Sequence, residues 1–126
     1  MQALAWYRKA AEQGNAVAQF SLGFMYNNGE GVPQDYVQAL SWYRKAAEQG
    51  NAGAQSELGV MYNNGQGVPQ DYVQAHLWSN LAAAGFSAAM VDMRNEAADN
   101  RDKIMAKMTP AQIAEAQRLA REWKSK

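Results

Sequence analysis

Apolar positions along the chain follow the spacing of amphipathic α-helices. Between residues 36 and 49, apolar and small side chains fall at steps of three and four: Tyr36, Ala39, Leu40, Tyr43, Ala46 and Ala47. This spacing predicts a helix from Tyr36 to Gln49 with one buried face. A preceding helix is predicted from Ala16 to Asn27, and Gly29, Gly31 and Pro33 separate the two. Since no segment alternates apolar and polar residues as a strand would, the pattern predicts an all-α fold.

Polar residues at the predicted helix starts have the chemistry of N-caps. Asn15 precedes the first helix of the pair and Asp35 precedes the second. Gln38 follows Asp35 by three residues, a variant of the capping box. These residues fix where each helix is expected to begin.

Two glycines lie inside predicted helices. Gly23 and Gly59 occupy equivalent positions, where glycine costs about 1 kcal/mol relative to alanine. We therefore expect the second helix of each pair to approach closely at these points, aided by Ala46 and Ala82.

The chain contains an internal repeat. The segment MYNNGEGVPQDYVQAL begins at Met25, and MYNNGQGVPQDYVQAH begins 36 residues later at Met61. Near the start, ALAWYRKAAEQG matches ALSWYRKAAEQG of the first full repeat. A repeat of this length indicates a stack of similar helical units. The sequence thus predicts a single domain over 1–126, with a half repeat (second helix only) at 1–14, repeats at 15–50 and 51–86, and C-terminal capping helices at 87–126.

The C-terminal segment departs from the repeat. A long helical stretch is predicted from Ser87 to about Met108. One side of it carries Met90, Met93, Ala97, Ile104 and Met108. Thr109, Pro110 and Gln112 then form a capping-box start for a last helix. That helix has Ile113, Ala116, Ala120 and Trp123 on one face and polar residues opposite, as the end of a helical stack requires.

Composition excludes several classes of protein. With 12 Lys+Arg, 12 Asp+Glu and zero net charge, the chain lacks the basic balance of a nucleic-acid binder. Absence of Cys excludes disulfides, thiol catalysis and zinc ribbons. No apolar run approaches the ~18 residues of a membrane span, and Trp6, Arg8, Lys9 and Glu12 interrupt any signal-peptide core. The compartment stays open: cytoplasmic, or periplasmic if a signal was trimmed.

The residues do not favour an enzyme. His76 is the only histidine, and a lone histidine on a helix is more often packed or exposed than catalytic. Asp92, Glu96 and Asp99 share a helical face and suggest a metal site, but the basic residues around them favour a solvated charged face. The prediction is therefore a protein without catalytic residues, metal or cofactor.

The repeat motif resembles a known family. LGxMYNNGxGVPQDYVQA followed by WYRKAAEQGN is similar to the Sel-one-like repeat, a branch of the tetratricopeptide superfamily, over Met1 to Phe86. The tail MTPAQIAEAQRLAREW is similar to the terminal cap of bacterial members. The resemblance implies a right-handed α-α superhelix, or solenoid, of helix pairs that acts as a scaffold for protein complexes. Because the chain has no cysteine, the resemblance disfavours the secreted subgroup that uses disulfides.

A binding groove is predicted where the two repeats differ. Within the first helix of each unit, the differing pairs lie on one helical stripe: Val17 and Gly53, Phe20 and Ser56, Ser21 and Glu57, Phe24 and Val60. The resemblance implies an overlapping concave stripe of Val17, Phe20, Phe24, Asn27 and Asn28, and of Gly53, Ser56, Val60, Asn63 and Asn64. Asn amides can hold a peptide backbone, and Phe side chains offer an apolar pocket. We therefore expect an extended peptide or a partner helix to bind there.

Structural roles compete with this hypothesis. Phe20 and Phe24 could instead pack against the lone N-terminal helix, and Asn27 and Asn28 could merely close the turn before Gly29. The periodic residues Trp6, Trp42 and Trp78 are predicted to pack between repeats. Tyr26 and Tyr62 are predicted in the core, with locally bonded hydroxyls.

Charge and the start of the chain bear on partners. Residues 1–86 hold 4 Lys+Arg and 6 Asp+Glu, which favours a neutral or mildly basic partner.

Met1 aligns with Val37, so the chain opens at the second helix of a unit. The uncovered apolar face predicts a homodimer, or a longer parent protein. A self-associating fragment without a ligand and, from the resemblance, weak binding of cell-wall-type small molecules are the alternative functions.

Overall fold

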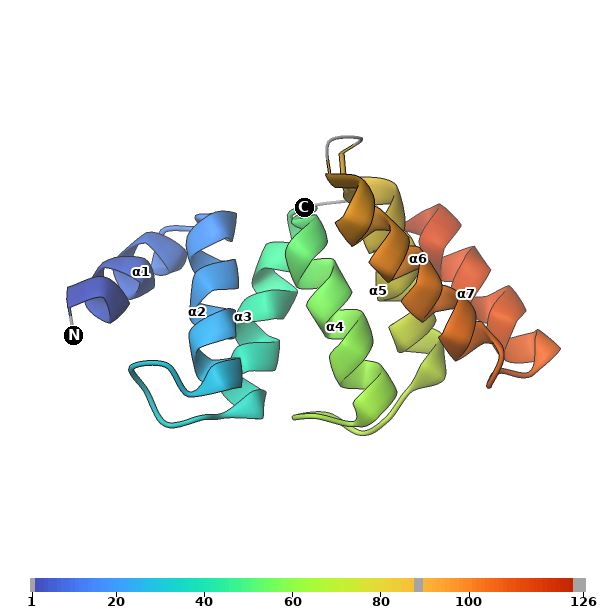
Figure 1. Ribbon diagram of the computed structural model, residues 1–126, viewed down its shortest axis with the longest axis horizontal. Coiled ribbons are helices and arrows are strands. Elements are labelled where there is room, and N and C mark those ends of the chain that lie inside the picture. The colour runs from blue at the N-terminus through green and yellow to red at the C-terminus, as the bar shows by residue number, and fades with distance from the viewer. Residues whose placement is uncertain (1, 88–89, 124–126) are drawn as a thin grey trace.

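The computed structural model describes residues 2–87 and 90–123, which form seven α-helices and no strand (Figure 1). The helices are α1 (Gln2–Glu12), α2 (Ala16–Asn28), α3 (Tyr36–Glu48), α4 (Ala52–Asn64), α5 (Tyr72–Gly85), α6 (Val91–Met105) and α7 (Pro110–Glu122). The all-α prediction is confirmed. Helix α6 is shorter than the stretch expected from Ser87 to Met108, and residues 88–89 of that stretch lie outside the described residues.

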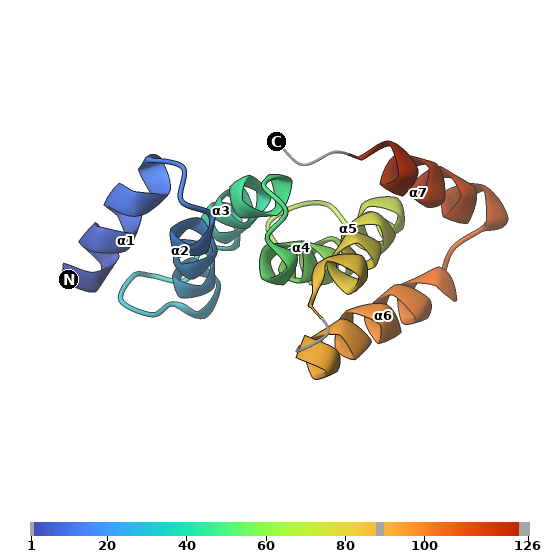
Figure 2. The ribbon, with the colours of Figure 1, turned by 90° about the horizontal axis from the view of Figure 1, so that it is seen from above.

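The helices stack in chain order along one direction (Figures 1 and 2). Each of the first five helices packs against the next, and α7 packs against α5. In Figure 2, α2, α4 and α6 lie toward one side of the stack, and α3, α5 and α7 lie toward the other. This arrangement is the solenoid of helix pairs that the repeat predicts.

The predicted caps form in both repeats. Asn15 Oδ1 accepts a hydrogen bond from the Ala18 N–H at 2.9 Å, and Asp35 Oδ1 accepts from the Gln38 N–H at 3.1 Å. Equivalent bonds start α4 and α5. The helix ends differ from expectation by one residue, since α2 extends to Asn28 and α3 stops at Glu48.

Gly23 and Gly59 do mark close helix approach. A Cβ atom on Gly23 would lie 2.6 Å from Cδ1 of Tyr43, a fully buried ring. On Gly59 it would meet the Ser79 hydroxyl and the carbonyl oxygen of Ala75. The nearest atoms thus belong to residues one helical turn before Ala46 and Ala82, the small residues expected to aid the approach.

The largest core cluster joins the two repeats to the C-terminal segment. It includes Tyr43, Leu58 and Trp78, and it extends to Ile104 of α6. Trp42 is buried in a second cluster built from α1, α2 and α3. Both tryptophans thus pack across unit boundaries as predicted.

The prediction is wrong for Trp6, whose side chain is 66% exposed. Within residues 2–87 and 90–123, Trp6 belongs to neither of the core clusters to which Trp42 and Trp78 contribute. Trp6 contacts only the edge of Tyr7 among the described ring pairs, with centroids 5.4 Å apart.

Polar contacts repeat at each junction between units. Arg8 donates to the Tyr26 hydroxyl, and Arg44 donates to the Tyr62 hydroxyl, each 18 residues further along the chain. The prediction of locally bonded hydroxyls is therefore wrong, because the donor comes from the second helix of the preceding unit.

A buried glutamine accompanies each of these contacts. Gln19 Nε2 donates to the Ala11 carbonyl at 3.1 Å, and Gln55 Nε2 donates to the Ala47 carbonyl at 3.2 Å. Both glutamines are buried. Their amides satisfy carbonyls near the end of the preceding helix, which fixes the turn between units.

The last two helices cover α5 from two sides (Figure 2). Ala97 and Ile104 of α6 are buried, but Met90 and Met93 are 49% and 53% exposed. The expected single apolar face is thus only partly buried, because the two methionines border an open hollow instead of filling the core.

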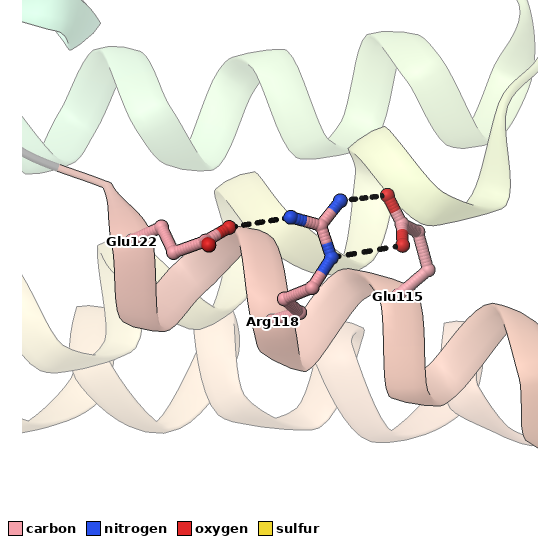
Figure 3. Close-up of polar contacts among 3 residues, drawn as sticks. All are labelled: Glu115, Arg118 and Glu122. Atoms are coloured by element: carbon pink, nitrogen blue, oxygen red, sulfur yellow. Dashed lines mark hydrogen bonds and ion pairs between the residues drawn. The ribbon is translucent and has the colours of Figure 1, made fainter.

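Helix α7 ends the stack with an apolar inner face and a charged outer one. Ala116 is buried, and Trp123 meets Trp78 edge-on at 6.2 Å between centroids. Thr109 and Gln112 form the predicted reciprocal capping box. On the exposed side, Arg118 bridges Glu115 and Glu122 (Figure 3), and the hydrogen bond from Arg118 lowers the pKa of the Glu115 carboxyl.

Candidate functional site

The first hollow lies between α1, α2 and the turn after α2. Its volume is about 490 Å³. It is lined by Tyr7, Phe20, Ser21, Phe24, Met25, Glu30 and Gly31. Phe24 is 43% exposed there, whereas Val17 is 67% exposed and does not contribute to the lining. Of the predicted first-repeat residues, the structure therefore brings Phe20 and Phe24 together.

A second depression, here called the central groove, crosses α2, α4, the end of α5 and α6. It comprises two adjoining hollows of about 410 and 160 Å³ that share Phe20, Gly53, Phe86 and Met93. The larger hollow adds Asn51, Ala52, Gly85, Ser87 and Met90, and the smaller one adds Ser56, Glu57 and Glu96. Three units of the stack thus contribute to one apolar surface.

Phe20 stands at the junction of the first hollow and the central groove. Its ring packs 5.6 Å from the Tyr43 ring, centroid to centroid, and is half-buried. A Cβ atom on Gly53 would lie 3.1 Å from its Cε1 atom, so the missing side chain at Gly53 makes room for the ring. Phe20 therefore packs toward the second repeat and not chiefly against the lone N-terminal helix.

Two carboxylates line the smaller hollow of the central groove. Glu57 is half-buried on α4, and Glu96 is exposed on α6. Burial raises the pKa of the Glu57 carboxyl above its usual range, and the neighbouring charge of Glu96 acts in the same direction. Within residues 2–87 and 90–123, no ion pair joins either carboxylate to a Lys or Arg side chain.

The remaining second-repeat residues line a third hollow of about 230 Å³. Val60, Asn63 and Asn64 of α4 face α6 and the turn that follows it, which contribute Asn100, Lys103, Ile104 and Lys107. Asn63 Nδ2 donates to Asn64 Oδ1 at 3.3 Å. The C-terminal segment therefore flanks this part of the predicted stripe, and the stripe is not one continuous groove.

Asn27 and Asn28 lie within α2 and line none of these four hollows. The carbonyl of Asn27 accepts a hydrogen bond from Gln34 Nε2 at 3.2 Å. The left-handed residue that ends α2 is Gly29, with φ of 69°. Neither asparagine is itself left-handed, and the bond from Gln34 across the turn agrees with the structural alternative for Asn27.

Sequence reasoning missed the C-terminal contribution to the central groove. Phe86 is the last residue of the second repeat, and Met90, Met93 and Glu96 belong to the segment after it. One signal was available, because Phe86 stands where the first repeat has Gly50. A large aromatic residue at a glycine position indicates a changed environment at the end of the second repeat.

His76 is packed rather than exposed. Its side chain is 2% exposed, and neither ring nitrogen has a hydrogen-bond partner among the described residues. It borders a hollow of about 180 Å³ with Asn80, Arg101 and two further residues of the last helices. Burial and, secondarily, the charge of Arg101 lower the pKa of the imidazole, while Asp102 opposes them.

The acidic face of α6 has no metal-site geometry. Asp92, Glu96 and Asp99 are all exposed. Across the described ranges, no three His, Cys, Asp or Glu side chains are grouped to hold a metal ion. None of the described helices combines the length and the hydrophobicity that crossing a bilayer takes.

The chain is similar to one family of repeats and to solved structures with the same type of repeat. The Sel1 repeat model matches residues 1–15, 16–51 and 52–85. A crystal structure of a protective antigen with an SLR fold, present in uropathogenic Escherichia coli strains, is 41% identical with a TM-score of 0.86 and covers 95% of this chain. A Sel1 repeat protein from Oxalobacter formigenes is also 41% identical, with a TM-score of 0.67 over 75% of this chain. No curated protein matches.

The two structures come from longer proteins. The chain spans 24% of the antigen and 35% of the Oxalobacter protein. The family model covers all three units recognised from the repeat and stops where the repeat stops. Members of this family are typically non-enzymatic repeat scaffolds that mediate protein interactions. The chain belongs to the Sel1 repeat family.

Proposed function

We propose that the chain is a non-enzymatic interaction scaffold whose central groove binds a peptide or a partner helix. The observation that carries the proposal is the exposed apolar lining shared by three units, with Phe20 in the middle and Met90 and Met93 at the rim. Exposed apolar surface bordered by polar residues is typical of protein interaction sites. Family membership supports the same function.

The groove also coincides with positions that differ between the repeats. Gly53, Ser56 and Glu57 replace Val17, Phe20 and Ser21 of the first repeat. The buried residues Leu22 and Leu58, by contrast, are identical in both. Within the first helix of each unit, the differing positions are thus expected to serve recognition and the identical buried ones to serve packing.

The test is a selection from a random-peptide phage library against the full chain. We expect bound peptides to shift the amide NMR signals of Phe20, Gly53 and Met93, and Met93→Asn to weaken binding about tenfold. Val37→Asn is the matched control, because Val37 is 64% exposed on α3 and lines none of the hollows described above. Selection of no peptide, or of peptides that leave these signals unchanged, would refute this function.

Self-association is the second candidate. Trp6 is 66% exposed beside Tyr7, and Tyr7 lines the same hollow as the exposed Phe24. A second copy that covered α1 would bury these rings. Sedimentation velocity at several concentrations is expected to show a dimer that Trp6→Gln weakens. A monomer at all concentrations would exclude this candidate.

A further inference from the structure

We propose that the partner inserts a Lys or Arg side chain between Glu57 and Glu96, and that apolar neighbours of that residue rest on Phe20 and Met93. This inference rests on the proposed function, since it specifies which partner the central groove accepts. The occupant is therefore a basic-apolar peptide segment.

Apolar side chains form part of the lining of the central groove. Phe20, Phe86 and Met93 line both hollows of the central groove. Phe86 is buried, so Phe20 and Met93 offer the accessible apolar surface. Rings and thioethers of this kind bury the methylene stem of a Lys or Arg side chain well. An aliphatic or aromatic side chain one or two positions away in the partner would occupy the larger hollow.

Two carboxylates form the charged part of the lining. Glu57 and Glu96 line the same hollow, and no described cation pairs with either of them. Two like charges at a partly desolvated site repel each other, and Glu57 is the more buried of the two. A partner cation relieves this repulsion, whereas an acidic partner would increase it. Burial and the charge of Glu96 raise the pKa of Glu57, which is the direction expected for such a site.

The carboxylate pair is not needed by the repeat itself. Ser21 stands in the first repeat where Glu57 stands in the second, and the first-repeat helices form without a carboxylate there. Glu57 makes none of the caps or junction bonds that hold the units together. Its unfavourable environment therefore indicates a role in recognition.

The experiment compares three full-length chains against peptides selected on the natural sequence. One chain carries Glu57→Gln and Glu96→Gln, and the control carries Glu12→Gln and Glu30→Gln, which removes equal charge elsewhere. Glu30 lines the first hollow, so the control also tests that site. Each peptide is made in a second form with citrulline in place of its arginine, which keeps the shape and removes the charge. Thermal melts establish that all three chains fold.

We expect selected peptides to be rich in Arg or Lys flanked by apolar residues. Citrulline replacement should weaken binding to the natural chain about tenfold or more, and change little in the Glu57→Gln, Glu96→Gln chain. Equal binding of both peptide forms to the natural chain would overturn the inference but leave the proposed function standing. Sensitivity to Glu12→Gln and Glu30→Gln instead would also overturn it, by assigning the cation contact to the first hollow. Failure to select any peptide would refute both.

Discussion

At the scale of single residues, close contacts explain why glycine occurs inside helices despite its low helix propensity. Gly23 sits in the middle of α2 because the ring of Tyr43 occupies the space of a Cβ atom. Gly53 likewise makes room for Phe20, which brings the aromatic ring into the central groove. Small residues thus determine both the packing and the shape of the candidate site.

The first prediction concerns Gly23→Ala. The added methyl group would overlap Cδ1 of the fully buried Tyr43 ring, which must shift. Overpacking of this kind costs about 1–3 kcal/mol, and the gain in helix propensity of up to about 1 kcal/mol only partly offsets it. Urea denaturation should therefore show a lower free energy of unfolding. Ser21→Ala in the same helix is the control, and an equally stable Gly23→Ala chain would contradict the close contact.

The second prediction concerns pH and His76. Because burial and Arg101 lower the pKa of His76 in the folded chain, the unfolded chain binds the proton more readily. The folded state is therefore expected to lose stability as the pH falls below about 6.5, the ordinary histidine value. His76→Leu, which installs the residue found at Leu40 of the first repeat, should remove this part of the pH dependence.

The measurement is urea denaturation of both chains at pH 5 and pH 8. We expect the natural chain to lose more of its free energy of unfolding between pH 8 and pH 5 than His76→Leu does. Parallel stability curves across this range would show that the imidazole does not titrate differently in the two states.

At the scale of helices and their junctions, local features were predictable and non-local ones were not. The caps at Asn15 and Asp35 were predictable because an N-cap and its N–H donor are only three residues apart. The bond from Arg44 to Tyr62 was not, because it joins helices of different units. The position of α6 beside α4 was also missed, since the repeat supplies no template for the tail.

In the candidate site, residues of the two repeats were predictable and residues of the C-terminal segment were not. Phe20, Gly53 and Ser56 were identified because two copies of one sequence could be compared directly. Met93 and Glu96 have no counterpart in that comparison, so only the packing of the last helices on α5 brings them to the groove.

The third prediction tests a junction between units. Tyr62→Phe removes the hydroxyl to which Arg44 donates but keeps the ring, over which the guanidinium lies at 5.7 Å. We expect a loss of about 1 kcal/mol in the free energy of unfolding, the usual worth of one hydrogen bond. Tyr72→Phe is the matched control, because the Tyr72 hydroxyl bonds only to the exposed turn residue Gln70. Equal effects of the two variants would argue against a specific junction contact.

At the scale of the whole molecule, the core is concentrated in the middle of the stack. The largest cluster draws on α3, α4, α5 and α6, whereas α1 joins only the smaller cluster around Leu22 and Trp42. In a solenoid each unit is stabilised mainly by its neighbours, so helices at the centre should be more stable against unfolding than helices at the ends. Stability is therefore expected to vary along the chain.

The fourth prediction follows from this distribution. Amide hydrogen exchange should be slowest in α4 and the second half of α3, and fastest in α1. Exchange measured by NMR or mass spectrometry at several urea concentrations would rank the helices. If α1 exchanged as slowly as α4, the units would unfold together and the gradient would be absent.

The central groove draws its residues from successive units, so its size depends on how these units follow one another along the chain. Phe20 belongs to the first full repeat, Glu57 to the second, and Glu96 to the segment that follows. An extra copy inserted between the two repeats would keep every cap and junction bond, yet it would move Phe20 one step away from both carboxylates. A ligand that contacts Phe20 and both carboxylates at once would then no longer span the distance between them. The number of repeats therefore determines the length of ligand that this groove can bind.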